Sequence, residues 1–350
     1  MKTSPFVSTS SVTQAVRHSL LRMQTNLISS QKELSTGRVA DMGLALGSKT
    51  GEAVSFKRDM DRLSGIIDSN TLVSARLKST QEAMNQMTTV AQTFLQTLTA
   101  SVSGDASQSI VLTDARGTVE ALTSVLNTTL NGEYLFAGIN TDVKPVDNFN
   151  APGSTAKAAF DAAFLGHFGF AQTAPAAANI TGAQMDNFID AVVVPQILGT
   201  GWETDWSSAS DQGIQTRIAL NETTETSVSA NEIGIKKLVV AAAVVADLFS
   251  AELSQEARNA LSSKALSMVG EGLSALADLQ SRTGVVENRV KRASERLEMQ
   301  VDLFERNILD MEGVDPYEAK TRVDTLLTQI EMSYALTARI QQLSLVKFLA

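Results

Sequence analysis

Residues 63–98 read LSGIIDSNTLVSARLKSTQEAMNQMTTVAQTFLQTL, and they carry the strongest periodic pattern in the chain. One set of seam positions recurs every seven residues, and a second set follows three residues behind it. The first set is Leu63, Asn70, Leu77, Met84, Ala91 and Leu98, and the second is Ile66, Val73, Met87 and Phe94. This spacing predicts one long helix that packs against a partner helix.

The two ends of the chain follow the same pattern. A narrow apolar stripe predicts a helix over 12–34, and Gly37 is well placed for the left-handed conformation that ends helices. After Thr283-Gly284 the heptad returns at Val290, Leu297, Phe304 and Met311, with Val286, Ala293, Val301 and Ile308 beside them. Both ends therefore predict helices that need partners.

The last helix has its own start signal. Asp315 and Pro316, with Glu318 at the third helical position, form a start of capping-box type. The stripe that follows consists of Val323, Leu327, Ile330 and Tyr334. Earlier in the chain, a third helix is expected over 110–130, stopped by Asn131-Gly132.

The centre has a different composition. Most of the prolines, both tryptophans and a cluster of phenylalanines lie between residues 140 and 231. Residues 214–220 and 223–228 flank Asn221-Glu222 and predict a β-hairpin, and residues 184–198 predict a short helix. We interpret this segment as either a mixed α/β or a mostly β insert.

The predicted fold class is mainly α. Helices from both chain ends form a long antiparallel coiled-coil bundle, and a mixed or β-rich domain is inserted at its centre. Five segments are expected: an N-terminal assembly helix (1–36), two halves of a helical stem (37–142 and 231–314), an inserted outer domain (143–230) and a C-terminal assembly helix (315–350).

Composition argues against several classes of function. The formal charge of −9 disfavours a nucleic-acid binder, because phosphate neutralisation requires a basic surface. The chain has no cysteine and two histidines, which leaves little for zinc or nucleophilic chemistry. Residues 43–50 imitate a phosphate-binding loop, but the spacing of their glycines is wrong. We expect no enzyme, no catalytic residue, no metal and no cofactor.

Targeting signals are equally sparse. The first 38 residues contain no apolar run long enough for a cleaved signal peptide. The most apolar segment, 238–246, has nine residues, whereas a bilayer span needs about 20. No membrane association is expected, and these signals alone indicate a cytoplasmic protein.

Apolar residues at the two ends bear on assembly. A heptad alone favours a bundle within one chain, but apolar side chains on more than one side of the last helix favour contacts with other subunits. The predicted assembly interface is Val12, Val16, Leu20, Met23, Leu27 and Leu34, facing Ile330, Leu343, Leu345, Val346, Phe348 and Leu349. We expect residues 1–36 and 316–350 to be labile alone and ordered in an assembly.

Short motifs add a resemblance to a known family. The segment ELSTGR (33–38) and the closing LSLVKFL (343–349) resemble the flagellin superfamily. NGEYLFAGINT (131–141), with Ser333-Tyr334, is similar to the branch known as hook-associated protein 3, whose members join hook to filament. The loop 40–45 departs from the family because it keeps one aspartate where two are usual. The match covers about residues 5–145 and 230–350 and leaves the insert unmatched.

The resemblance implies a structural component of the bacterial flagellum that connects hook to filament. Implied partners are further copies of the chain in a ring or tube, the other hook–filament junction protein, flagellin and an export chaperone. It also implies an extracellular location, reached through the flagellar type III channel without signal-peptide cleavage. The alternatives are flagellin itself, an intracellular coiled-coil scaffold and, more remotely, an enzyme housed in the insert.

Overall fold

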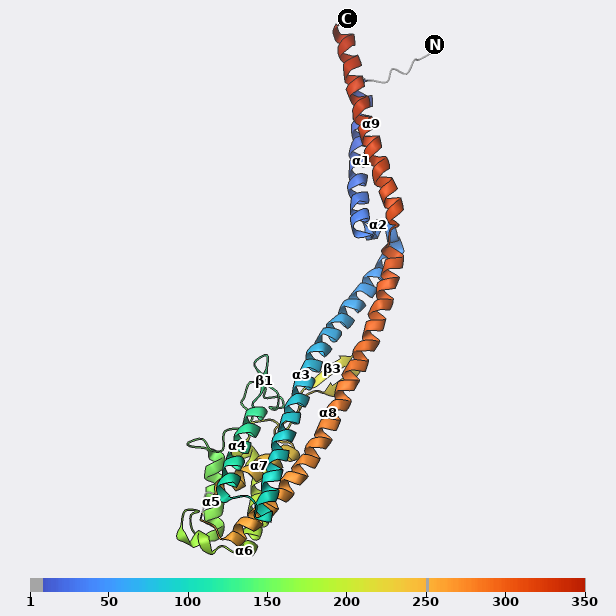
Figure 1. Ribbon diagram of the computed structural model, residues 1–350. Helices are drawn as coiled ribbons and strands as arrows, with labels where there is room; N and C mark the ends of the chain where they lie inside the picture. The colour runs from blue at the N-terminus through green and yellow to red at the C-terminus, as the bar shows by residue number, and fades with distance from the viewer. Residues whose placement is uncertain (1–8, 250–251, 350) are drawn as a thin grey trace. The chain divides into compact units, whose positions relative to one another are not determined.

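The computed structural model describes residues 9–249 and 252–349, and side chains throughout these ranges except at 9, 10, 13 and 340–349. Long helices come from both ends of the sequence: α1 (Thr9–Thr36), α3 (Thr50–Ser103), α8 (Gln255–Glu312) and α9 (Pro316–Leu349) (Figure 1). The predicted mainly α fold is thereby confirmed. The chain divides into a terminal unit, residues 1–65 with 297–350, and a central unit, residues 66–296.

In the terminal unit, α1 and α9 lie side by side and antiparallel (Figure 1). Gln24 donates to the hydroxyl of Tyr334 at 3.1 Å, and Glu33 pairs with Arg322 at 3.1 Å. After α1 the short helices α2 (Met42–Leu46) and η1 (Gly47–Lys49) lead into α3. Stacking of Phe56 on Phe304, with ring centroids 5.5 Å apart, joins the start of α3 to the end of α8.

In the central unit, α3 and α8 pack antiparallel along the predicted seam. Three hydrogen bonds fix the register, from Asn70 to Ser294, from Gln81 to the Gln280 carbonyl, and between Ser101 and Ser262. The heptad that returns after Thr283-Gly284 in the sequence belongs to the same helix as the residues before it. α8 continues through this point, and the Thr283 hydroxyl donates to the Leu279 carbonyl within it.

Two further helices complete the core of the central unit. They are α4 (Gln108–Leu126) and α7 (Ile233–Leu248), which pack on each other. Almost every residue of α7 is buried, which explains why 238–246 is apolar on all sides. Among the described residues, no helix is long and apolar enough to cross a membrane.

The insert is mixed rather than mostly β. It contains α5 (Thr155–Phe168), η2 (Pro175–Asn179), α6 (Gly182–Phe188) and the π-helical segments η3 (Ile189–Ile197) and η4 (Trp202–Trp206). The predicted hairpin is present as β3 (Gln215–Ala219) paired antiparallel with β4 (Glu222–Glu225). Residues 184–198 are helical, as expected, through α6 and η3.

The third helix ends earlier than predicted. α4 stops at Leu126, and β1 (Thr129–Leu130) and β2 (Glu133–Tyr134) form a second hairpin. Asn131 and Gly132 have φ of 54° and 86°, the positive pair that a two-residue hairpin turn requires. The signal assigned to a helix stop is therefore a strand turn.

Arg76 of α3 binds strand β2 of this hairpin, and the residues after β2 are buried. Arg76 donates through Nη1 to Glu133 and through Nη2 to the Tyr134 carbonyl, both at 2.7 Å. The side chains of Leu135, Phe136 and Ala137 are fully buried. Residues 131–137 of the family-like motif thus form an internal anchor.

Gly138 lies where two backbone segments meet. Ser210 donates to the Ala137 carbonyl at 3.0 Å, and Ile139 donates to the Gln212 carbonyl at 3.0 Å. Gly138 has φ of +63°, and a Cβ there would lie 2.3 Å from the Ser210 carbonyl oxygen. Only glycine fits this crossing.

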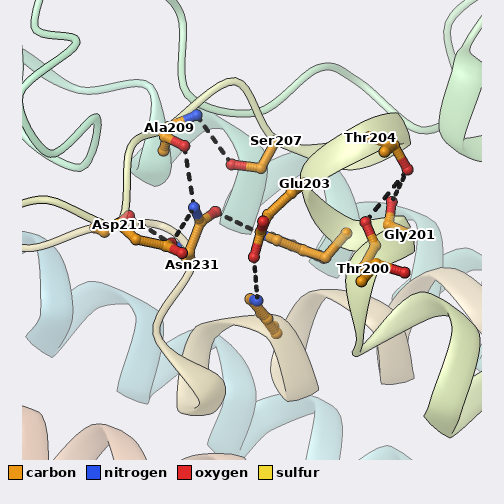
Figure 2. A network of polar contacts seen from close by, with 11 residues as sticks. Thr200, Gly201, Glu203, Thr204, Ser207, Ala209, Asp211 and Asn231 are labelled. Carbon is orange, nitrogen blue, oxygen red and sulfur yellow. Dashed lines mark hydrogen bonds and ion pairs between the residues drawn. The ribbon is translucent and has the colours of Figure 1, made fainter.

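Asn231 ties the end of the insert to η4 (Figure 2). Its Oδ1 accepts from the indole Nε1 of Trp202 at 2.9 Å, while its Nδ2 donates to the Ala209 carbonyl at 3.0 Å and to Asp211 at 2.7 Å. Trp202 is fully buried, so this bond satisfies an N–H that would otherwise be desolvated without a partner.

A lysine holds α5 against α7. Lys157 contacts Asp161 at 2.9 Å and Asp247 at 2.7 Å, and the Asp247 side chain is only 7 % exposed. Burial raises the pKa of Asp247 above its ordinary value, although the hydrogen bond from Lys157 acts in the opposite direction. Burial would lower the pKa of Lys157, but its hydrogen bonds to Asp247 and Asp161 outweigh it and raise that pKa.

We expect Lys157→Met to lower the free energy of unfolding by about 1–3 kcal/mol at pH 8, because it leaves the Asp247 carboxylate buried without its counter-charge. The pKa of Asp247 is raised in the folded state, so the stability it contributes is present below the unfolded pKa and is lost as pH rises through the folded pKa. The deficit should therefore shrink as pH falls and the Asp247 carboxyl becomes protonated. Urea unfolding followed by tryptophan fluorescence measures it, and Lys157→Met with Asp247→Asn should recover most of the loss. A deficit independent of pH would contradict this account.

We expect Gly138→Ala to lower the free energy of unfolding of the central unit by about 2–4 kcal/mol, because the methyl group collides with two carbonyl oxygens. The matched control is Gly104→Ala, at φ of +81° with nothing within 4 Å of its Cβ. The control should cost about 1 kcal/mol, the penalty of the left-handed conformation alone. Equal losses in the two variants, measured by urea unfolding, would show that the close approach is unimportant.

Candidate functional site

The terminal helix pair is the candidate site, because the predicted interface lies on it. Val12, Val16, Leu20, Met23 and Leu27 are half-buried along α1. Leu34 is 38 % exposed, and Ile330 of α9 is buried. The predicted partners at Leu343, Leu345, Val346, Phe348 and Leu349 lie outside the residues whose side chains are described.

The seam of α9 is not the stripe that the sequence predicted. Its inward positions alternate in steps of three and four residues and are Ala319, Val323, Leu326, Ile330, Ser333 and Thr337. Leu327 and Tyr334, expected on the stripe, are instead 41 % and 53 % exposed. They lie one position beyond the seam, so α9 carries apolar side chains on a second face.

The terminal unit buries little of its apolar surface. Its buried apolar residues in the described part are Ala53, Leu63, Leu297, Ile308, Ala319, Val323 and Ile330. Large apolar side chains that it exposes are Leu21, Ile28, Leu34, Leu44, Val54, Met299, Leu303, Leu309, Tyr317, Leu327, Met332, Tyr334 and Leu336. So many exposed large apolar side chains in one unit indicate a candidate interaction surface.

Two of the exposed residues on α1 escaped the sequence analysis. Leu21 and Ile28 are seven residues apart and point away from the seam, and Ile28 is 68 % exposed. The signal was the doublets Leu20-Leu21 and Leu27-Ile28, in which the second residue lies on a neighbouring face. A search for a single seam overlooks such pairs.

The ELSTGR segment builds the turn at the end of α1. Gly37 has φ of +67° and donates to the Glu33 carbonyl at 2.8 Å, as the predicted helix stop requires. The Glu33 carboxylate accepts from the backbone N–H of Ala40 and from Arg322 of α9. Arg322 also donates to Glu318, one turn earlier in α9.

A backbone clasp joins this turn to the break between α8 and α9. Val39 donates to the Glu312 carbonyl at 2.8 Å, and Val314 donates to the Gly37 carbonyl at 3.0 Å. Arg38 covers the buried Glu312 carboxylate at 3.5 Å. Asp315 caps α9 as predicted, since its Oδ1 accepts from the N–H of Tyr317 at 2.8 Å. The reciprocal half of the expected capping box is not formed, because Glu318 pairs with Arg322. The clasp therefore sets where the helix pair α1 and α9 begins.

One cavity of the central unit lies beside the Lys157 group. It measures about 810 Å³ and is lined by residues of α4, α5, α7 and the adjoining loops, including Arg116 and Glu120. Lys157, Asp161 and Asp247 already pair with one another, which leaves no activated nucleophile and base. Within the described ranges, no cluster of three histidine or acidic side chains could hold a metal ion.

Comparison with protein families matches both ends of the chain. Residues 7–141 match the bacterial flagellin N-terminal helical region, and residues 266–349 match the bacterial flagellin C-terminal helical region. Comparison with curated proteins gives no match.

One similar solved structure is that of a candidate flagellar hook-associated protein from Vibrio parahaemolyticus. The two chains are 10 % identical with a TM-score of 0.52, and the match covers 75 % of this chain and 97 % of that one. At this identity the match shows a similar fold and nothing more. Because the two family regions together span more than half of the sequence and coincide with the helices that pair, the chain belongs to the flagellin superfamily and is a structural protein of the bacterial flagellum.

Proposed function

We propose that this chain is a hook-associated junction protein that connects the flagellar hook to the filament. The exposed apolar surface of the terminal unit carries the proposal, because helices that bury so little within one chain need neighbouring subunits. The junction-like segment 131–141 and the similar fold of a candidate hook-associated protein support this branch over others.

The proposed arrangement assigns a role to each segment. The assembly helices at 1–36 and 315–350 continue the tube of the hook, the stem halves 37–142 and 231–314 support them, and the insert 143–230 faces outward. Partners are other copies of the chain, the second junction protein, flagellin and an export chaperone. The protein acts outside the cell, after export through the flagellar type III channel without signal-peptide cleavage.

Flagellin is the second candidate, because both family regions are named for it. Purified full-length chain separates the two functions. A flagellin should polymerise into long filaments from seeds, whereas a junction protein should stop at rings or short assemblies. Long filaments formed by the chain alone would overturn the junction assignment.

Deletion of the gene from its bacterium tests the function directly. We expect cells with hooks but no filaments, and flagellin released into the medium, because the filament has nothing on which to begin. Electron microscopy and immunoblotting of culture supernatant give the readout. Normal filaments in the deletion strain would refute the proposal.

The ends can be tested by substitution. We expect Leu20→Asp with Leu345→Asp to lower assembly more than about tenfold, because each carboxylate would be desolvated in an apolar contact. The central unit should stay folded, with unchanged urea unfolding by tryptophan fluorescence. Leu72→Asp, at an exposed position of the central unit, is the control and should assemble normally. Normal incorporation of the double variant into flagella would show that these ends are not the interface.

A further inference from the structure

The outward face of α1 combines apolar and basic residues. Arg17, Leu21, Ile28 and Lys32 are spaced by four, seven and four residues, so they share one stripe of the helix. All four are exposed. We name these residues the basic stripe; it spans about 22 Å at 1.5 Å per residue.

The end of α8 in the same unit carries the opposite charge. Its exposed apolar residues are Met299, Leu303 and Leu309. Exposed carboxylates surround them at Glu298, Asp302, Glu305 and Asp310, while Arg306 is the cation among them. We name the three apolar and four acidic residues the acidic face; from first to last it spans about 18 Å.

Most charged groups of these two surfaces lack an ionic partner among the described residues, and the Lys32 ammonium donates to the Ala40 carbonyl at 2.9 Å. Among the described residues, none of these four carboxylates lies within 4.0 Å of a cationic nitrogen, nor does Arg17 lie within that distance of a carboxylate. Other acidic residues of this unit are paired, such as Glu33 with Arg322 and Glu312 with Arg38. Arg17 and the four carboxylates thus remain available to a partner of opposite charge.

The acidic face is also hollowed. A depression of about 330 Å³ is lined by Arg38, Asp302, Glu305, Arg306 and Leu309. Its volume can accept one large side chain. Its wall offers an apolar contact and two carboxylates, beside the guanidinium groups of Arg38 and Arg306. A leucine or isoleucine with a cation on the next helical turn could fill the depression and pair with a carboxylate of its wall.

We propose that the basic stripe of one copy docks on the acidic face of a second copy. The two surfaces have similar lengths, apolar residues at their centres and opposite charge, which is the complementarity that selects partners and register. They are different patches of the same unit, so the contact is heterologous and repeats from copy to copy into a ring or helical tube. The inference rests on the proposed function, since it names the contact through which the junction protein meets its own copies.

The absence of cysteine from the chain allows a direct test. Leu21→Cys is placed on one tagged full-length chain and Leu303→Cys on a differently tagged one, and the two are mixed under mild oxidation. We expect a disulfide-linked heterodimer in at least tenfold excess over the control pair of Leu21→Cys with Leu72→Cys, roughly the selectivity of a specific contact. Equal yields for the two pairs would overturn the proposal.

Charge exchange provides the second measurement. Arg17→Glu alone, or Asp302→Lys with Glu305→Lys alone, should lower the yield of the specific cross-link about tenfold through like-charge repulsion. All three substitutions in each chain should restore at least half of it, because the charges are then exchanged rather than removed. Failure of the combined variant to exceed either partial variant would overturn the proposal. A cross-link from Leu21→Cys to added flagellin that carries an introduced cysteine, in preference to a second copy, would also overturn it.

The outcome is separable from that of the proposed function. A deletion strain without filaments, together with no excess of the specific cross-link, would reject this contact and keep the junction role. A strong cross-link with normal filaments in the deletion strain would keep the contact and reject the junction role.

Discussion

Burial of apolar surface between α3 and α8 in the central unit is the interaction on which the rest of the structure depends. Residues distant in sequence meet along it, as Ser101 and Ser262 do, so forming the seam closes a very long loop. That closure is entropically costly and must be offset by burial. The core provides it with α4, with α7, which is apolar on nearly all sides, and with aromatic residues of the insert such as Phe160 and Phe188. The insert is thus part of what holds the stem together.

The terminal unit has no comparable source of stability. Fully burying a side chain such as Val323 or Ile330 contributes about 1.5–3 kcal/mol, whereas ordering the backbone costs about 1–2 kcal/mol per residue. With a short set of buried positions along two long helices, we expect the balance within one chain to be unfavourable for α1 and α9. The clasp at Gly37 and Val314 fixes where the pair starts, but it adds few apolar contacts along its length. Added apolar surface from neighbouring copies would change the sign of this balance.

Periodicity predicted the helices well, because a seven-residue repeat is a local property of the sequence. It could not predict which residues of a distant segment pack on the seam. Asn70 occupies a seam position and is fully buried, yet its amide bonds the carbonyl of Ile218 in β3. Ile218 in turn fills a small core with Leu77 and Val290. Which residue of a distant hairpin caps a polar seam position depends on tertiary structure. The interface prediction on α1 identified only the seam that faces α9, because periodicity detects packing within the chain. The outward residues Leu21 and Ile28 do not pack inside the chain.

The motif residues that build the internal turns differ from the residues of the proposed contact between copies, and chemistry explains the difference. Gly138 and Glu33 meet backbone groups at fixed distances, a task that few side chains can perform, so their identity is restrictive and their segments are recognisable. An exposed apolar face needs only suitable size and charge, which many residues supply. The resemblance therefore locates the internal turns and anchors of this fold, while the choice of neighbouring subunit falls to side chains such as Ile28 and Leu303 that belong to no motif. Two chains of this family can share every turn and still assemble with different partners.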